Sequence, residues 1–307
     1  MSELRPGDRL DQYLLEDIIA RSGMATIFRA RDTENDQRVA LKVPYLQYES
    51  DLVFHERFLR EEQIGLRLHH PAIIKVFRPK EKSRVYLAME YIEGELLSVR
   101  LHREGRLPIA TALDFAVQTA DALVYLHSQN VVHRDLKPEN IMILAGGKLK
   151  LMDFGIALDA SLRKITWSGL SQTMGTPDYM APEQVKGRRG DAHTDIYSLG
   201  VILYEMVTGQ VPFTGENVYA AMRAKVHDDP VAPRKLRPDL SPQLEEIILH
   251  ALERAPKDRF ESAIAFLEAL THPEGVTLTD RAARQRPKSK GMPWLRTLLT
   301  FITGKRQ

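Results

Sequence analysis

One polar stretch near the middle of the chain constrains the fold and the chemistry of this protein more than any other. Residues 133–140 spell HRDLKPEN, and DFG follows at residues 153–155, eighteen positions after Asp135. Asp135 supplies a carboxylate that can accept a hydroxyl proton, and Lys137 supplies a cation that can meet phosphate charge. Asn140 and Asp153 add oxygen ligands for a hard metal ion. These groups, in this order, are typical of a phosphoryl-transfer site.

The same residues resemble the catalytic-loop and DFG signatures of the protein kinase superfamily. The resemblance covers roughly residues 8–270, and the DLKPEN form resembles the serine/threonine branch. GMAT at 23–26 and GTP at 175–177 resemble bacterial members, known as Hanks-type or eukaryotic-like kinases. The resemblance implies an α+β, bilobal fold with a small, mostly β N-lobe that holds one main helix and a larger, mostly α C-lobe.

Hydrophobic patterns along the chain agree with two lobes of different structure. Before residue 90, short apolar or alternating runs indicate strands, and one helical stretch lies near residues 52–68. After Gly94 the pattern is helical. With the resemblance, this pattern predicts a kinase domain over residues 1–270 and a tail at 271–307. Within the domain we expect the N-lobe at about 8–89, the hinge at 90–94 and the C-lobe at 95–270.

The patterns also locate individual C-lobe helices. One helix is predicted to end at Gln129-Asn130 and to turn one face inward, formed by Leu113, Ala116, Val117, Ala120, Leu123, Val124 and His127. Residues 196–207 are apolar nearly all round, which indicates a helix buried within the lobe, and Thr208-Gly209 provides its end. Ser241-Pro242 is expected to cap the start of another helix.

Composition limits the class of protein. A chain of 307 residues that is 43% hydrophobic can bury a sizeable core. Because it has no cysteine, disulfides and thiolate metal sites are excluded, and a reducing compartment is suitable. The first residues lack the basic and apolar regions of a signal peptide, so we expect a cytoplasmic location.

The charge is distributed unevenly. Eight of the 43 Lys and Arg residues lie in 281–307, whereas all 41 Asp and Glu residues lie before it. The overall charge of +2 therefore reflects a basic tail on an acidic body. Nucleic-acid binding would need basic residues across a folded face, with aromatic residues among them, so no nucleic-acid partner is expected.

The resemblance assigns the phosphate-holding lysine to Lys42, in the run 39–43. A lysine with a long flexible stem needs a fixed carboxylate to be positioned for catalysis. Glu61, nineteen residues later in the helical stretch, is the expected partner, and the neighbouring Glu62 is the rival assignment.

The family also implies a nucleotide pocket. Met89 resembles the gatekeeper before the hinge, and the backbone of Glu90 and Ile92 is expected to pair with adenine. Ile27 and Ala40 would lie above the ring and Met142 below it. The full set of expected nucleotide contacts is Ile19, Ala20, Arg21, Ser22, Gly23, Met24, Ala25, Thr26, Ile27, Ala40, Lys42, Met89, Glu90, Ile92 and Met142.

The phosphate loop departs from the family pattern. The three standard glycines are replaced by Ala20, Ser22 and Ala25, and only the extra Gly23 remains. Because glycine lets the backbone approach phosphate closely, these side chains are expected to weaken ATP binding. A nucleotide-binding pseudokinase scaffold is the alternative function, although the retained Lys42 and catalytic residues favour an active enzyme.

The expected reaction is transfer of the γ-phosphate of ATP to Ser or Thr hydroxyls, with Mg²⁺ or Mn²⁺. Asp135 would orient the hydroxyl and take its proton, Lys137 would contact the γ-phosphate, and Asn140 with Asp153 would hold the metal. Glu183 with Arg259 is expected to form an ion pair of the C-lobe, and Asp195 to bind the catalytic-loop backbone. Autophosphorylation is expected in the activation segment, where the candidates are Ser161, Thr166, Ser168, Ser171 and Thr173, with Thr176 as a structural contact.

The tail has two parts. Residues 281–292 are basic and lack apolar periodicity, which predicts a linker. Beyond them lies an apolar stripe at helical spacing, formed by Trp294, Leu295, Leu298, Leu299, Phe301 and Ile302. The stripe is too short to span a bilayer. It could lie at the inner face of a membrane, dock on the body or bind a partner, and membrane attachment would favour self-association for trans-phosphorylation.

Overall fold

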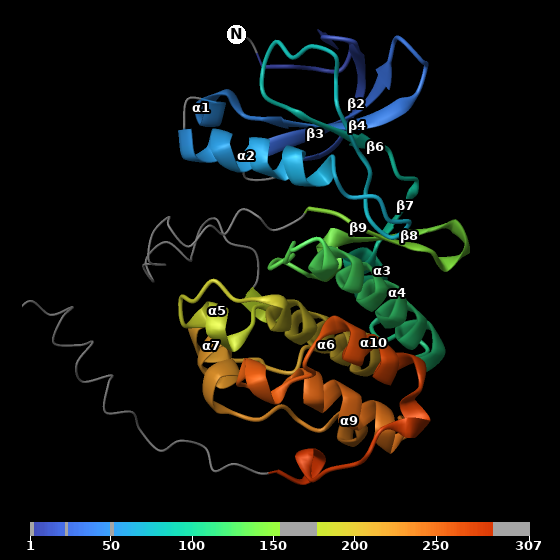
Figure 1. The fold of residues 1–307 in the computed structure, drawn as a ribbon, viewed down its shortest axis with the longest axis vertical. Coiled ribbons are helices and arrows are strands. Elements are labelled where there is room, and N and C mark those ends of the chain that lie inside the picture. The colour runs from blue at the N-terminus through green and yellow to red at the C-terminus, as the bar shows by residue number, and fades with distance from the viewer. Residues whose placement is uncertain (1–2, 22–23, 50–51, 154–176, 285–307) are drawn as a thin grey trace, which may run out of the picture.

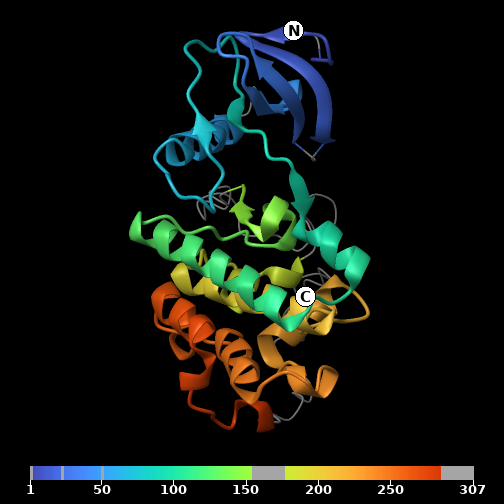
Figure 2. The same cartoon turned by 90° about the vertical axis from the view of Figure 1, so that its right-hand side faces the viewer.

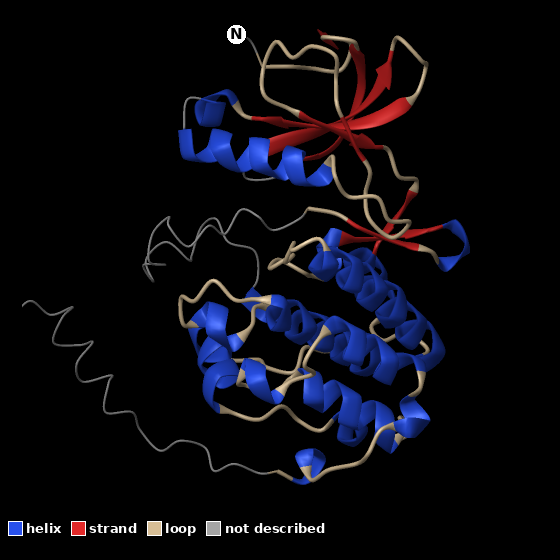
Figure 3. Cartoon of the chain, viewed as in Figure 1, coloured by secondary structure: helices blue, strands red, loops and turns tan. Residues whose placement is uncertain are grey.

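The chain forms two lobes, one rich in strands and one rich in helices (Figures 1 and 3). The structure is a computed structural model that describes residues 3–21, 24–49, 52–153 and 177–284. Strands gather in the N-terminal lobe and helices fill the C-terminal lobe, and the quarter-turn view in Figure 2 shows the same division. The bilobal α+β prediction is therefore confirmed.

The N-lobe is built on an antiparallel sheet with the order β1-β2-β3-β4-β6-β5 in the described residues. Its strands are β1 (Arg9–Leu10), β2 (Tyr13–Arg21), β3 (Ala25–Asp32), β4 (Arg38–Pro44), β5 (Val76–Phe77) and β6 (Leu87–Glu90). The short helix α1 (Leu46–Glu49) precedes α2 (Leu52–Gly65), which lies along one side of the sheet (Figure 1). Helix α2 is the helix expected near residues 52–68.

Successive side chains of β4 belong to two different hydrophobic clusters. Val39, Leu41 and Val43 belong to a cluster confined to the N-lobe, whereas Ala40 belongs to the large cluster shared with the C-lobe. Successive strand residues point to opposite faces, so Lys42 shares the face of Ala40. This register turns Lys42 toward the C-lobe.

The C-lobe begins with a small antiparallel sheet that the sequence patterns did not predict. Its order is β7-β8-β9, with β7 (Gly94–Leu96), β8 (Ile141–Leu144) and β9 (Leu149–Leu151). The helices of the lobe are α3 (Leu97–Glu104), α4 (Ile109–Ser128), α5 (Pro182–Val185), α6 (Ala192–Thr208), α7 (Val218–His227), α8 (Pro233–Leu236), α9 (Pro242–Ala251) and α10 (Ala263–Thr271). Short 3₁₀ turns are η1 (Pro138–Asn140), η2 (Ala145–Gly147), η4 (Pro177–Tyr179), η5 (Pro256–Asp258), η6 (Pro273–Gly275) and η7 (Arg281–Ala283).

Helix α6 is the buried helix of the lobe, as predicted for residues 196–207. Its side chains from Thr194 to Leu203 are all buried, and Gly209 ends it in the left-handed conformation with φ of 82°. The predicted cap of α9 is also present, because the Ser241 hydroxyl oxygen accepts from the Leu244 N–H at 3.1 Å.

Helix α4 ends near Gln129 as predicted, but its buried face is broader than the predicted one. Ala116, Ala120 and Leu123 are buried, whereas Leu113, Val117, Val124 and His127 are only partly buried. Phe115 and Leu126, which were not predicted, are buried as well, since α4 packs against both α6 and α10. By length and composition alone α4 would suit a membrane span, and its apolarity here serves the core.

A buried ion pair joins distant parts of the C-lobe. The Arg259 guanidinium donates to both carboxylate oxygens of Glu183, at 2.8 and 2.9 Å, and the Thr194 hydroxyl donates to the same carboxylate at 2.9 Å. Arg259 also lies 4.8 Å from the ring centre of Tyr197. The predicted Glu183–Arg259 pair is therefore present, and it ties α5 to α6 and to the turn after η5.

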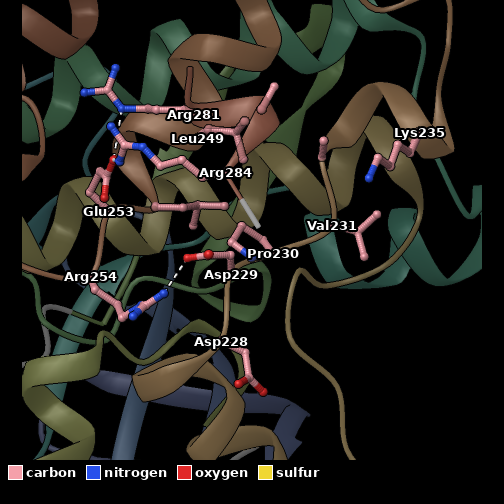
Figure 4. Close-up of a pocket in the computed structure, with 13 residues that line it drawn as sticks. Asp228, Asp229, Pro230, Val231, Lys235, Leu249, Glu253, Arg254, Arg281 and Arg284 are labelled. Carbon is pink, nitrogen blue, oxygen red and sulfur yellow. Dashed lines mark hydrogen bonds and ion pairs between the residues drawn. The ribbon is translucent and has the colours of Figure 1, made fainter. Parts of the chain in front are cut away.

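The first residues of the predicted tail lie against the C-lobe. Arg281 pairs with Glu246 of α9. Arg281 also pairs with Glu253, at 3.1 Å, and Arg284 pairs with Glu253 at 2.7 Å (Figure 4). The Thr279 hydroxyl also donates to Glu246, at 2.8 Å. Arg281 and Arg284, at the start of the predicted basic linker, are therefore held by acidic side chains of the C-lobe. The apolar stripe beyond them lies outside the described residues.

Candidate active site

The sheet positions Lys42 above the C-lobe among apolar neighbours. Lys42 is opposite Ile27 on β3 and Leu87 on β6, while Ala40 is opposite Met89. Ile27, Ala40 and Met89 all pack in or against the core cluster that continues into the C-lobe. The three residues expected around the nucleotide base from the N-lobe therefore surround the strand lysine.

Lys42 meets one carboxylate from each lobe. Its Nζ lies 3.0 Å from Glu61 Oε1 on α2 and 2.7 Å from Asp153 Oδ1, two residues after β9. Glu62, the rival carboxylate, pairs with Lys82 and not with Lys42. The structure thus resolves the alternative between the two neighbouring glutamates in favour of Glu61.

The three groups set each other's ionisation. Burial alone would lower the pKa of the Lys42 ammonium, but Glu61 and Asp153 raise that pKa above its ordinary value. Lys42 holds the pKa of Asp153 below its ordinary range despite burial. Burial raises the pKa of Glu61, and Lys42 opposes this shift. Lys42 is therefore a stable cation at neutral pH, suited to binding a polyanion.

The second cluster of the site comes from the loop between α4 and β8. Lys137 Nζ donates to Asp135 Oδ2 at 2.8 Å, and the Asn140 amide donates to the Asp135 carbonyl oxygen at 2.7 Å. The Asp135 side chain is 46% exposed, so a hydroxyl group could reach it, whereas Asn140 is buried. Asp135, Lys137 and Asn140 are thus brought together as the sequence predicted.

This loop holds an uncommon backbone conformation. Arg134 in this loop has φ of 62°, and Asp153, beyond β9, has φ of 51°. Both values lie in the left-handed region that non-glycine residues seldom adopt. The fully buried Asp195 accepts hydrogen bonds from the N–H groups of His133, at 2.9 Å, and Arg134, at 2.8 Å. The predicted contact of Asp195 with the loop is therefore present. It offsets the backbone strain directly beside Asp135.

Part of the segment that is expected to bind the adenine base already forms hydrogen bonds within the protein. The Glu90 N–H donates to the Lys75 carbonyl oxygen at 2.9 Å, and the Glu90 carboxylate accepts from Lys150 Nζ at 2.5 Å. The carbonyl oxygen of Glu90 is therefore the backbone atom that would accept a hydrogen bond from adenine. Ile92 lies in the connection between β6 and β7, and Met142 lies on β8 opposite Leu96.

The expected phosphate loop is the turn between β2 and β3. Ala20 and Arg21 are opposite Ile27 and Thr26, so the two strands form a hairpin around this turn. Ile19 and Met24 are exposed and Ala25 is buried, while Ser22 and Gly23 lie outside the described residues. The candidate phosphorylation positions from Ser161 to Thr173, and Thr176, also lie outside them.

A buried lysine that the sequence reasoning missed lies beside this segment. Lys225 on α7 is 2% exposed, and its Nζ donates to the carbonyl oxygens of Pro177 and Asp178 at 2.7 and 2.6 Å. It fixes the turn η4, which lies within the candidate activation segment between Asp153 and Glu183. No motif identified Lys225, since its partners are main-chain atoms 47 and 48 residues away.

Comparison with known proteins agrees with this geometry. The chain matches the protein kinase domain over residues 13–273. It is 37% identical over 268 residues to the serine/threonine-protein kinase PknB of Mycobacterium tuberculosis, an alignment that covers 84% of this chain and 42% of PknB. It is also 36% identical over 258 residues to PknB of Mycolicibacterium smegmatis, covering 82% of this chain and 41% of that protein. The chain therefore belongs to the protein kinase domain family, and its relatives are bacterial Hanks-type kinases.

A solved structure supports the fold independently. The crystal structure of the Mycobacterium tuberculosis PknI kinase domain aligns with a TM-score of 0.69 and 27% sequence identity, covering 89% of this chain and all of that domain. The chain spans about two fifths of the length of the curated relatives that it matches.

Lys225 generates a prediction about stability and pH. Burial lowers the pKa of its ammonium to about 7, although Asp178 opposes part of this shift. Between pH 7 and about 10.5, where an unfolded lysine is still protonated, the unfolded state binds a proton that the folded state lacks. This group therefore makes the free energy of unfolding rise with pH, by up to about 1.4 kcal/mol per pH unit.

Urea unfolding at pH 7, 8 and 9 should show a steeper rise for the wild type than for Lys225→Met. The control is Lys235→Met, which removes an exposed lysine and should keep the wild-type slope. Parallel curves for wild type and Lys225→Met would show that Lys225 is charged in the folded protein.

Proposed function

We propose that this chain transfers the γ-phosphate of ATP to serine and threonine hydroxyls of proteins, including its own. The observation that carries the proposal is Lys42 held between Glu61 and Asp153, with the Asp135 cluster on the same C-lobe framework. The serine/threonine kinase names of the bacterial relatives support the same chemistry. Transfer requires both a fixed cation for the nucleotide phosphates and a carboxylate for the acceptor hydroxyl.

The residue roles follow from this chemistry. Asp135 orients the acceptor hydroxyl and takes its proton, Lys137 meets the charge of the transferred phosphate, and Lys42 holds the other phosphates. Asn140 and Asp153 would hold the divalent metal, which neutralises phosphate charge. Their oxygen donors fit Mg²⁺ or Mn²⁺ better than zinc or copper. No cluster of three His, Cys, Asp or Glu side chains suited to a metal occurs in the described part of the chain.

The pseudokinase alternative receives no support from the site. Loss of catalysis would remove the need for Asp135, Lys137 and Asn140 to be held together, yet all three are joined by hydrogen bonds. The glycine-poor phosphate loop remains the feature that would weaken ATP binding. We expect this loop to lower the affinity for ATP without slowing the transfer step.

Removal of either central charge should abolish most of the activity. In a radiolabel assay with ATP and Mg²⁺ or Mn²⁺, Asp135→Asn and Lys42→Met should each lower autophosphorylation by about a hundredfold or more. Asp135→Asn removes the proton acceptor, and Lys42→Met removes the phosphate contact. Label incorporation by Asp135→Asn at the wild-type rate would refute the assignment.

We further propose that the protein lies in the cytoplasm and makes peripheral contact with the inner face of the membrane through its tail. Arg281 and Arg284 are already paired with C-lobe carboxylates, so we do not count them among the charges that would bind the membrane. Six Lys and Arg residues remain after Arg284, beside the apolar stripe that contains Trp294 and Phe301. Each contributes about 1 kcal/mol near an anionic surface. Concentration at a membrane would promote self-association and trans-phosphorylation.

A vesicle assay tests this contact. The intact chain should sediment with anionic vesicles at low salt and be released at high salt, whereas a chain ending at Arg284 should stay in solution. This end point keeps the pairs of Arg281 and Arg284, so the C-lobe is unchanged. Autophosphorylation of the intact chain should also become faster with anionic vesicles. Equal binding to neutral vesicles, or no binding, would contradict the proposal.

A further inference from the structure

Glu62, which is not the partner of Lys42, forms a second ion pair between α2 and the rest of the N-lobe. Lys82 Nζ lies 2.5 Å from Glu62 Oε1 and donates to the Tyr86 carbonyl oxygen at 2.7 Å. The side chains of Glu62 and Lys82 are only 12% and 23% exposed. Exposed ion pairs contribute little because water screens them, so this mostly buried pair is better suited to hold α2 in place.

Lys82 belongs to a loop that is itself anchored to the sheet. It lies 5.0 Å from the ring centre of Tyr86, a fully buried residue. The Tyr86 hydroxyl donates to Asp11 Oδ2 at 2.8 Å, and the Ser83 N–H donates to the same carboxylate at 3.1 Å. Asp11 lies in the turn between β1 and β2. The Lys82 ammonium is therefore a fixed point relative to the sheet.

Two adjacent ion pairs constrain a helix differently from one. Consecutive residues of an α-helix lie about 100° apart around its axis. Glu61 faces Lys42 on β4, while Glu62 faces Lys82 in the loop before β6. With a single pair, α2 could turn about its axis until Glu61 moved away from Lys42. With both pairs in place, that rotation would break one of them.

We propose that Lys82 is a positioning residue that, through Glu62, sets the rotation of α2 and keeps Glu61 against Lys42. The inference rests on the proposed phosphate transfer, in which Lys42 requires that partner. Lys82 touches none of the reacting groups, so it acts on the reaction only through the helix.

The direct test is the kinetics of Lys82→Met. It should lower kcat about tenfold with a smaller change in the KM for ATP, because misplacement of Glu61 affects the transition state more than nucleotide binding. Lys82→Arg, which keeps the charge, should recover most of the activity. Lys80→Met is the matched control, because Lys80 lies in the same loop but is exposed and pairs with Glu34. It should keep the wild-type kcat.

Glu62→Gln separates positioning from simple loss of stability, since it leaves Lys82 on the Tyr86 carbonyl. It should show the same fall in kcat as Lys82→Met, with a melting temperature near that of the wild type. The double variant Glu62→Gln/Lys82→Met should be no slower than either single variant. A wild-type kcat for Glu62→Gln, or additive losses in the double variant, would overturn the inference about Lys82. The proposed function would still stand, provided that the wild type transfers phosphate. An inactive wild type would instead refute the function itself.

Discussion

The ion pairs of Lys42 are the contact on which the rest of the site depends. A partly buried ammonium is stable only where carboxylates compensate for the water that it has lost. Here one carboxylate comes from each lobe, Glu61 from α2 and Asp153 from the end of the β9 segment. The same cation therefore fixes α2, β4 and the segment that carries Asp153 relative to one another. Any change that rotates α2 or shifts Asp153 removes part of this compensation.

The two lobes hold their site residues in place through different contacts. The C-lobe is rigid beneath the catalytic loop, because Asp195 on the buried helix α6 holds the backbone before Asp135. In the described part of the N-lobe, the ion pairs of Glu61 and Glu62 join α2 to β4 and to the loop before β6, and Phe58 belongs to the core cluster shared with the C-lobe. The site therefore depends on these two ion pairs for the placement of α2 and on Asp195 for the placement of Asp135.

Sequence patterns predicted the parts of the molecule that motifs and residues close together in the chain determine. Motif order located Asp135, Asn140 and Asp153, and apolar periodicity located the buried helix α6. The partners that the patterns missed are pairs distant along the chain, such as Lys225 with the Pro177 carbonyl and Lys82 with Glu62, which have no characteristic spacing. The same reason applies to Arg281 and Arg284. Charge composition indicated a linker at residues 281–292, and only the fold brings Glu246 and Glu253 to Arg281.

The most direct test of the central claim is the rate of phosphate transfer by Glu61→Gln. The substitution keeps the size of the side chain and one acceptor oxygen but removes the charge that compensates Lys42. The account predicts that kcat falls by about a hundredfold while the protein stays folded, since the loss affects charge placement in the transition state. A Glu61→Gln enzyme that transfers phosphate at the wild-type rate would contradict the claim that Lys42 depends on this pair.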